Sequence, residues 1–496
     1  MLRTRRWGRF AANIMHFRKA ITTIAACAAL SGCNGLPGGA PSRVDPVAAV
    51  PGRVSIGLEE AIGARESPRV IAEYGGVYSD PEIEAVLATI VGRLIQASDD
   101  PTRRYRIPVL NSPVANAFAL PGGYLYVTRG LLALANDESE LAAVLSHEIA
   151  HVLANHALER ARVVERAGLV EKVATDVLSD PLVGKAAVHR SKLTLARFTQ
   201  TQEIEADKLG IRIAGNAGFD PFAASRFIDK LQKYAAFRSA IGEQDEAAGF
   251  LTSHPEAPQR RALAVQTARQ FGAPGLGETR RKDYLDALDG IIFGDDPAQG
   301  FVRGREFLHP RLSIGFSVPA GYRLENTRSA VLAAAGRDRA MRFDGVTVGT
   351  ASSPAAYLAS GWVNGLQPET VKQTMVNGLQ AATASAKAGE WSFRIAVIQV
   401  GPSMYRIIFA DRGDGSAIGA ALQSTLASFR RLTPADTARL RPLRIETVRA
   451  RNGDSVSRLA GRIRGTDRRI ELFRILNGIE DGDAVTPGEY YKIVVD

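Results

Sequence analysis

The chain has 496 residues, of which 45% are hydrophobic and 23% charged, and its formal net charge is +10. This length is too great for one compact core, so about two to four domains are expected, and the composition is that of a folded globular protein. Six basic and no acidic residues lie among the first 19, so the net charge without them is about +4, which is too small to predict nucleic-acid binding.

The N-terminal segment has the layout of an export signal. Its basic cluster precedes the apolar run Ala20 to Leu30, which is too short to span a membrane permanently. The run ends in Leu30-Ser31-Gly32-Cys33, which resembles the lipobox of bacterial lipoproteins. We therefore predict a lipoprotein signal peptide over residues 1–32 that starts at Met1 or Met15. The alternative is a buried apolar helix that ends near a chance cysteine.

The lipobox resemblance implies that Cys33 carries lipid and anchors the chain to a membrane. A Gly/Pro-rich stretch follows, so we expect residues 33–55 to be a flexible tether. Asn34, directly after the cysteine, favours the outer membrane under the sorting rules of this class. The chain has no cysteine besides Cys27 and Cys33, so any metal in the body must be held by His, Asp and Glu.

Residues 56–270 read as a helix-rich domain, with one expected strand at Tyr124 to Thr128 after Pro121-Gly122-Gly123. Glycine, proline and charge accumulate over residues 271–300, which indicates a linker.

Residues 301–432 change to a pattern of alternating apolar and polar positions. Leu312 to Val318, Phe393 to Val400 and Met404 to Phe409 predict strands, and Ala417 to Phe429 predicts an amphipathic helix. We expect a small α+β domain, and its sequence indicates no role.

Two histidines stand four residues apart in Ser146-His147-Glu148-Ile149-Ala150-His151. Asn136-Asp137-Glu138 predicts the start of a helix through this stretch, on which residues four apart are separated by about 400° and leave the same face. Two imidazoles there can share one ion, and Glu148 lies where it can take a proton from a water on that ion. This is the H-E-x-x-H zinc signature. The alternative is a pair of helix histidines that bind no metal.

A catalytic zinc ion needs three protein ligands and one open position. Glu203 and Asp207 lie at i and i+4 of a second predicted helix, so one carboxylate can bind the metal while the other supports it. His156 follows His151 by five residues, about 140° further round the helix, so we do not expect it to join the same ion unless the helix breaks.

Together these motifs resemble the M48 gluzincin metallopeptidases, in particular the periplasmic BepA-like branch, over about residues 60–265. The matching motifs are Asn116-Ala117-Phe118-Ala119-Leu120-Pro121-Gly122-Gly123, His147-Glu148-Ile149-Ala150-His151 and Glu203-Ile204-Glu205-Ala206-Asp207. The resemblance implies one Zn²⁺ per chain, held by His147, His151 and Glu203. It assigns catalytic roles to Glu148, as the general base that acts on a zinc-activated water, and to Asp207. The enzyme class implied is a zinc metalloendopeptidase of the EC 3.4.24 type.

A further candidate ligand lies in the same part of the chain. The stretch Ser253-His254-Pro255 matches the branch at a histidine that can bind the zinc as a fourth, inhibitory ligand. His254 is therefore expected to be a regulatory ligand or a transition-state donor, and the alternative is a surface histidine that caps a helix.

We also expect Phe118 to Thr128 to be an edge strand that pairs with extended substrate. Its site residues are Asn116, Phe118, Gly122 and Gly123, and the alternative is an ordinary core hairpin.

Residues 443–495 resemble a LysM domain, a βααβ module that binds glycans such as peptidoglycan. The resemblance rests on Asn452-Gly453-Asp454, Leu476-Asn477-Gly478 and Pro487-Gly488. It implies possible binding of peptidoglycan, and the alternative is a docking module without glycan affinity.

The expected fold is thus multidomain: a mainly α gluzincin metallopeptidase domain with a small β-sheet, then an α+β domain, then a βααβ LysM-like module. The expected function is a lipid-anchored zinc endopeptidase on the periplasmic side of a Gram-negative envelope, more specifically at the outer membrane. Its substrates would be unfolded or misassembled envelope proteins, with a role in protein quality control. Two alternatives stay open: a non-catalytic peptidoglycan-binding or chaperone-like lipoprotein with a plugged zinc site, and an enzyme that cuts peptidoglycan cross-links.

Overall fold

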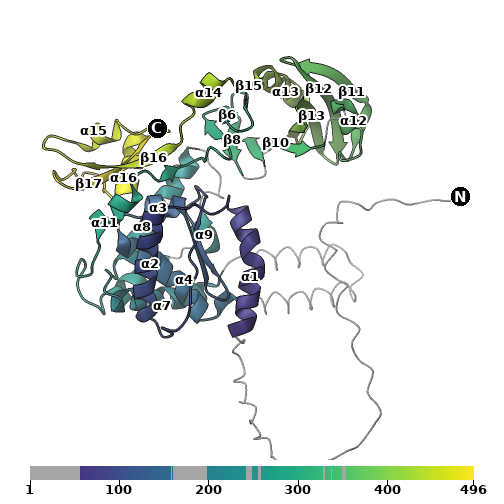
Figure 1. Ribbon diagram of the computed structural model, residues 1–496. Helices are drawn as coiled ribbons and strands as arrows, with labels where there is room; N and C mark the ends of the chain where they lie inside the picture. The colour runs from purple at the N-terminus through teal and green to yellow at the C-terminus, as the bar shows by residue number, and fades with distance from the viewer. Residues whose placement is uncertain are drawn as a thin grey trace, which may run out of the picture. The chain divides into compact units, whose positions relative to one another are not determined.

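The computed structural model describes residues 56–157, 159, 198–241, 249–254, 258–327, 330–336, 338–348 and 353–496 (Figure 1). Val54–Asp496 cluster into one compact unit. The predicted signal peptide over 1–32, lipid attachment at Cys33 and tether over 33–55 lie outside the described residues. Within the described part of the chain, no helix combines the length and the apolar character needed to cross a membrane.

The first region, up to residue 291, is mainly helical. Its helices are α1 (Ile56–Glu73), α2 (Pro81–Gln96), α3 (Arg129–Leu134), α4 (Glu138–Leu153), α7 (Gln200–Asn216), α8 (Ala223–Ala240), α9 (Gly249–Ser253), α10 (Pro258–Ala268) and α11 (Arg281–Leu288). Three short strands, β1 (Val109–Leu110), β2 (Ala117–Leu120) and β3 (Tyr124–Thr128), form a sheet in the order β1-β3-β2. The prediction of a mainly α region with a small sheet is confirmed.

Local sequence signals explain where two central helices of this region begin. The Asp80 side chain accepts a hydrogen bond from the Ile83 backbone at the start of α2, and the Asp137 side chain does the same for Glu140 at the start of α4. α2 buries one apolar stripe, whereas α4 is buried on nearly all sides. Ionisable side chains of α4 therefore lie inside the protein.

Helix α4 packs against α2, α7, α8 and β2. Gly210 of α7 faces the α4 backbone so closely that a Cβ atom there would lie 2.9 Å from the backbone nitrogen of His147. The absence of a side chain at this position lets α7 approach α4 backbone to backbone. The two helices that carry the predicted metal ligands are thus held side by side.

The segment 271–300, for which the sequence predicts a linker, contributes to the core. It contains α11, whose Tyr284, Leu285 and Leu288 are fully buried, and the short strand β4 (Ile292–Phe293). The Tyr284 hydroxyl donates a hydrogen bond to the Leu132 carbonyl of α3. Within this connection, α11 packs against α2 and β4 packs against α3.

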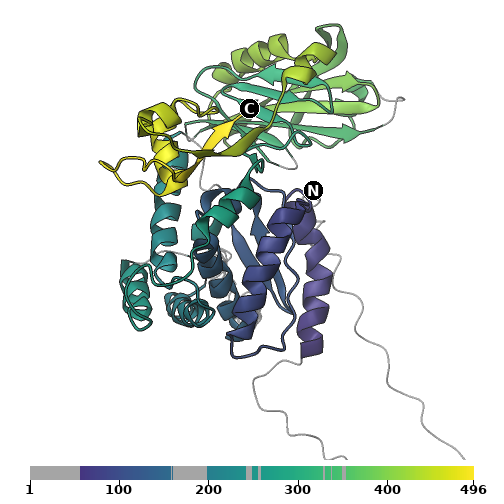
Figure 2. The same ribbon diagram turned by 60° about the vertical axis from the view of Figure 1, so that its left-hand side comes forward.

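The second region is built of antiparallel sheets (Figure 2). Four strands, β5 (Phe301–Arg303), β6 (Glu306–His309), β7 (Ile314–Ser317) and β15 (Arg430–Arg431), pair in the order β15-β7-β6-β5. Seven pair in the order β11-β12-β13-β14-β10-β9-β8: β8 (Arg323–Asn326), β9 (Val331–Ala335), β10 (Arg339–Thr347), β11 (Leu366–Val376), β12 (Leu379–Ala388), β13 (Trp391–Val400) and β14 (Ser403–Asp411). The strands predicted over 312–318, 393–400 and 404–409 are confirmed as β7, β13 and β14.

Two helices cover opposite faces of the seven-stranded sheet. Along β13, Ala396 and Ile398 pack in one apolar cluster with α13 (Ser416–Ser428), while Ile395 and Val397 pack in another with α12 (Pro354–Leu358). Successive side chains of a strand point to opposite faces, so this alternation gives the sheet two buried sides. The predicted helix over 417–429 is confirmed as α13.

After α14 (Pro434–Arg439), the C-terminal module follows the order strand, helix, helix, strand: β16 (Leu443–Arg449), α15 (Val456–Ala460), α16 (Arg469–Asn477) and β17 (Tyr490–Val495). β16 pairs with β17 and also with β4, which gives a sheet in the order β17-β16-β4. The predicted βααβ order is confirmed, and the likeness to LysM stays a prediction.

The C-terminal module shares its hydrophobic core with the helical region. One apolar cluster runs from α2 and α4 to α16 and β17. At its centre the buried Lys492 ammonium donates hydrogen bonds to the carbonyls of Ala133, Leu134 and Ala135, at 2.7, 3.2 and 2.6 Å. These carbonyls lie at the end of α3, where a helix leaves acceptors without internal partners. Lys492 thus caps a helix of the other region.

Candidate metal centre

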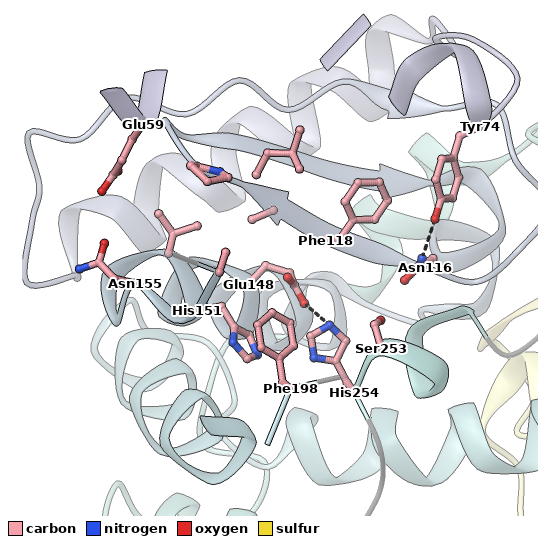
Figure 3. Close-up of a pocket in the computed structure, with 15 residues that line it drawn as sticks. Glu59, Tyr74, Asn116, Phe118, Glu148, His151, Asn155, Phe198, Ser253 and His254 are labelled. Carbon is pink, nitrogen blue, oxygen red and sulfur yellow. Dashed lines mark hydrogen bonds and ion pairs between the residues drawn. The ribbon is translucent and has the colours of Figure 1, made fainter. Parts of the chain in front are cut away.

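Four predicted residues converge on one point between α4, α7 and the end of α9. One ligand atom from each of His147, His151, Glu203 and His254 can be chosen so that all lie within 4.8 Å of one another, and all four residues are buried. Figure 3 shows His151 and His254 on the wall of the adjoining cleft, with Glu148 between them and β2.

The distances within this cluster fit a tetrahedral zinc ion. His147 Nε2 lies 3.0 Å from His151 Nε2 and 3.2 Å from His254 Nδ1. The Glu203 carboxylate lies 2.9 Å from His254 Nδ1 and 3.6 and 3.7 Å from the other two Nε2 atoms. With bonds of about 2.0–2.1 Å, the ligands of a tetrahedral zinc ion are about 3.4 Å apart. These side chains can therefore hold one Zn²⁺.

The charge of the cluster also fits a divalent cation. Glu148, Glu203 and Asp207 are buried with one guanidinium, that of Arg260, which leaves two negative charges in excess when all three carboxyl groups are ionised. Burial raises the pKa of Glu203 to about 6. Burial and then the Glu203 charge raise the pKa of Glu148 well above its usual range. One Zn²⁺ would balance the excess and favour the ionised carboxylates.

Asp207 lies outside the group of potential ligand atoms and contacts one of its members. Its Oδ1 lies 3.0 Å from the Nδ1 of His147, on the side of the ring that faces away from the other ligands. Arg260 donates to both Asp207 oxygens, at 2.7 and 2.8 Å. Burial alone would raise the pKa of Asp207, but the hydrogen bonds of Arg260 and His147 outweigh burial and lower it to about 2. Asp207 therefore stays ionised and orients His147.

His254 lies inside the cluster. It is 1% exposed, so the alternative of a surface histidine is wrong. The ring lies between those of Phe250 and Phe198, at centroid distances of 4.5 and 5.3 Å. Its Nδ1 points to the ligand atoms, and its Nε2 lies 3.3 Å from Glu148 Oε1 (Figure 3). In this conformation His254 lies with His147, His151 and Glu203 in one group of potential ligand atoms.

A cleft of about 250 Å³ opens beside the cluster. Asn116 and Phe118 line it, as do apolar side chains of β2 and α4, and β2 lies at the edge of its sheet (Figure 3). Gly122 and Gly123 do not line the cleft. They form the turn after β2, with φ angles of +81° and +79° that favour glycine. The predicted substrate residues thus divide into two that face the cleft and two that shape its edge strand.

Several site residues were missed by the sequence analysis. Phe198 stacks on His151 at a centroid distance of 4.0 Å, and Phe250 stacks on His254. Neither belongs to a motif, because an aromatic wall has no characteristic spacing. His156 does not join the ligand atoms, as expected, but its ring hydrogen-bonds to the back of His151. The sequence analysis considered His156 only as a ligand of the ion, and it did not predict this contact, which arises because α4 ends at Leu153.

Comparison with known proteins finds similarity in this part of the chain. Residues 81–268 match the sequence profile described as Peptidase family M48. The chain is 29% identical over 210 residues to the mitochondrial metalloendopeptidase OMA1 of Schizosaccharomyces pombe, which covers 42% of this chain and 60% of that protein. It is 30% identical over 250 residues to the beta-barrel assembly-enhancing protease of Yersinia pestis, covering 48% and 49%. The protease of the same name from Escherichia coli K12 is 28% identical over 216 residues, covering 42% and 43%. The chain spans about half the length of these curated relatives.

Proposed function

We propose that the chain, whose residues 81–268 form a domain of peptidase family M48, is a zinc metalloendopeptidase. The observation that carries the proposal is the buried ligand set of His147, His151 and Glu203, with the Glu148 carboxylate at the adjoining cleft. The relatives named as a metalloendopeptidase and as proteases support it.

The residues of the chain have distinct tasks in the proposed reaction. A zinc ion held here supplies a Lewis acid that lowers the pKa of a water molecule to near neutrality. Glu148 takes the proton of the attacking water and passes it to the leaving amine. Burial raises the pKa of Glu148, which suits a group that takes up a proton and then releases it. Asp207 and Arg260 keep the ligands oriented while this occurs.

The proposed substrates are unfolded or misassembled envelope proteins. An extended chain can pair with the edge of β2 through its main chain, which suits substrates of many sequences. Phe118, Leu120 and Val152 give the cleft apolar walls that suit the side chains exposed by unfolded proteins. The name of the Yersinia pestis and Escherichia coli relatives, beta-barrel assembly-enhancing protease, agrees with an envelope substrate.

We further propose that His254 acts as a removable fourth ligand. Its Nδ1 lies at ligand distance from His147 and Glu203, so four protein ligands would leave no position for water. Movement of His254 away from the cluster would open the site and keep the three other ligands. In the alternative function, a binding or chaperone-like lipoprotein, His254 stays in place and the zinc is structural.

The proposed location is the periplasmic side of the outer membrane, with lipid on Cys33. The sequence of the export signal and lipobox supports this. The βααβ order of residues 443–495 is compatible with a LysM-like module that binds peptidoglycan.

One assay tests the proposed function and separates it from the alternatives. Cleavage of unfolded casein and of purified peptidoglycan is measured for the wild type, Glu148→Gln and His254→Ala, together with bound zinc. We expect Glu148→Gln to keep zinc and to lose about 10²- to 10⁴-fold in casein cleavage, since it lacks the general base. We expect His254→Ala to be at least as active as the wild type.

The matched control is Glu82→Gln on the exposed first turn of α2, which makes the same chemical change away from the site. It should leave cleavage unchanged. Inertness of both the wild type and His254→Ala towards casein would favour the binding function. Cleavage of peptidoglycan in place of casein would favour the cell-wall enzyme.

A further inference from the structure

His156 is a buried residue that the proposed reaction does not use. It is 2% exposed, and its Nδ1 lies 2.9 Å from the Nδ1 of His151. Its Nε2 lies 3.5 Å from a carboxylate oxygen of Glu205, whose side chain is 61% exposed. The three side chains form a row that runs from the metal cluster to the surface.

The end of helix α4 and the turn after it bring His156 to this place. Helix α4 ends at Leu153 with Ala154 as its C-cap, and Asn155 follows in the left-handed conformation at φ 58°. Asparagine adopts this conformation more readily than most residues other than glycine. The turn carries His156 back towards α4, where its ring meets that of His151 edge-on at a centroid distance of 5.0 Å.

The ligand role of His151 fixes the direction of the hydrogen bond. The Nε2 of His151 points to the other ligand atoms, so it must carry a lone pair to bind a metal, and the ring proton must be on Nδ1. Nδ1 of His151 therefore donates, and Nδ1 of His156 accepts. The proton of His156 is then on Nε2, which faces Glu205.

The two metal histidines thus have different kinds of support. His147 donates from its Nδ1 to the ionised Asp207, which Arg260 holds in turn. His151 has a neutral imidazole in the corresponding place. A packing histidine would not need its nitrogen aimed at the one ring atom of His151 that is free when the other binds metal.

We propose that His156 is a positioning residue for the metal site: it accepts the Nδ1 proton of His151 and so holds that ring in the tautomer and orientation that bind zinc. The inference rests on the proposed metal site and not on peptidase activity. Loss of such an outer contact lowers metal affinity by about 10- to 100-fold in other zinc sites.

The test compares three replacements in the full-length protein, with zinc affinity as the readout. Asn places its side-chain oxygen close to where His has Nδ1, Gln places its amide beyond that point, and Leu fills the space without an acceptor. We expect His156→Leu and His156→Gln to weaken zinc binding by about 10- to 100-fold in competition with a chromophoric chelator. His156→Asn should recover most of the affinity. The visible absorption of bound Co²⁺, which reports ligand geometry, should change in the same order.

The matched control is His309→Leu, the same change at a buried histidine of the sheet region, and it should leave zinc affinity unaltered. Equal zinc affinity of His156→Leu, His156→Gln and the wild type would overturn the proposal. So would an Asn variant as weak as Gln, since packing alone would then explain the residue. If the wild type and His254→Ala both bind zinc but cleave no protein, the proposed function is overturned and this inference stands.

Discussion

The helical region and the sheet region bury their side chains in different ways. In the helical region, α4 alone buries Glu138, Glu140, His147, Glu148 and His151. In the sheet region, β13 and β14 bury almost entirely apolar side chains. Among the described residues 301–432, the buried acidic, basic or histidine side chains are His309 and Asp344.

This difference indicates which region depends on a bound ion. Burial of a charge is costly unless the charge is paired or binds a metal. Arg260 pairs with both Glu203 and Asp207, and burial raises the pKa of Glu148 and Glu203, so we expect a bound cation to stabilise the ionised carboxylates of the helical region. The buried side chains of the sheet region are mostly apolar, so we expect its stability not to change when an ion is removed.

The largest expected effect is on the sheet region, whose buried side chains are mostly apolar. Phe409 of β14 is fully buried and contacts the ring of Tyr322 at a centroid distance of 5.3 Å. We expect Phe409→Ala to lower the free energy of unfolding of the sheet region by about 3–5 kcal/mol, because it leaves a cavity. Hydrogen exchange of β13 and β14 measures this loss, while exchange in α4 and zinc affinity should not change. Phe409→Leu leaves a smaller cavity and should lower the free energy of unfolding by less. A loss of zinc in either variant would show that the stability of the sheet region and the metal centre are not independent.

Removal of zinc should destabilise the helical region and leave the sheet region unchanged. A ligand at 100 times its Kd stabilises the folded state by about 2.7 kcal/mol. If zinc is present at this level, its removal by a chelator should lower the free energy of unfolding of the helical region by the same amount. Hydrogen exchange should speed up in α4 and α7 and stay constant in β13 and β14. Chelator already saturated with zinc is the control. Equal acceleration in both regions would show that they do not differ in their dependence on the ion.

The smallest expected effect concerns the shared core. Lys492→Met removes the donor to three carbonyls at the end of α3, which should destabilise the helical region by roughly 1–3 kcal/mol. Exchange in α3 and α16 should accelerate, and exchange in the sheet region should not. The exposed Lys372→Met on β11 is the control. If Lys492→Met leaves exchange in α3 unchanged, the contact of Lys492 with the α3 carbonyls does not stabilise the helical region.

Much of the metal centre follows from short-range spacing in the sequence. The interval of four residues between His147 and His151, and again between Glu203 and Asp207, places each pair on one helical face, and the structure brings both pairs together. Burial and the exact partners depend on which distant segments meet. The aromatic walls from Phe198 and Phe250 could not be predicted for that reason.

The fold shows the same division. The strands β7, β13 and β14 are predicted well because successive side chains of a strand point to opposite faces, a period that is visible in the local sequence. The segment 271–300 carries linker-like glycine and proline, yet Tyr284 and Leu288 bury α11 in the core. The turn at Asn155 was missed because the sequence offers no glycine there, although asparagine also adopts a positive φ.

Gly210 allows the close approach of the two helices that carry the metal centre. His147 and Glu203 lie on different helices, and the distance between those helices is limited by contact of the α7 backbone at Gly210 with the α4 backbone at His147. A methyl group there would wedge the two halves of the ligand set apart. The size of ion that the protein accepts therefore depends partly on a contact between main-chain atoms, at a position that contributes no ligand.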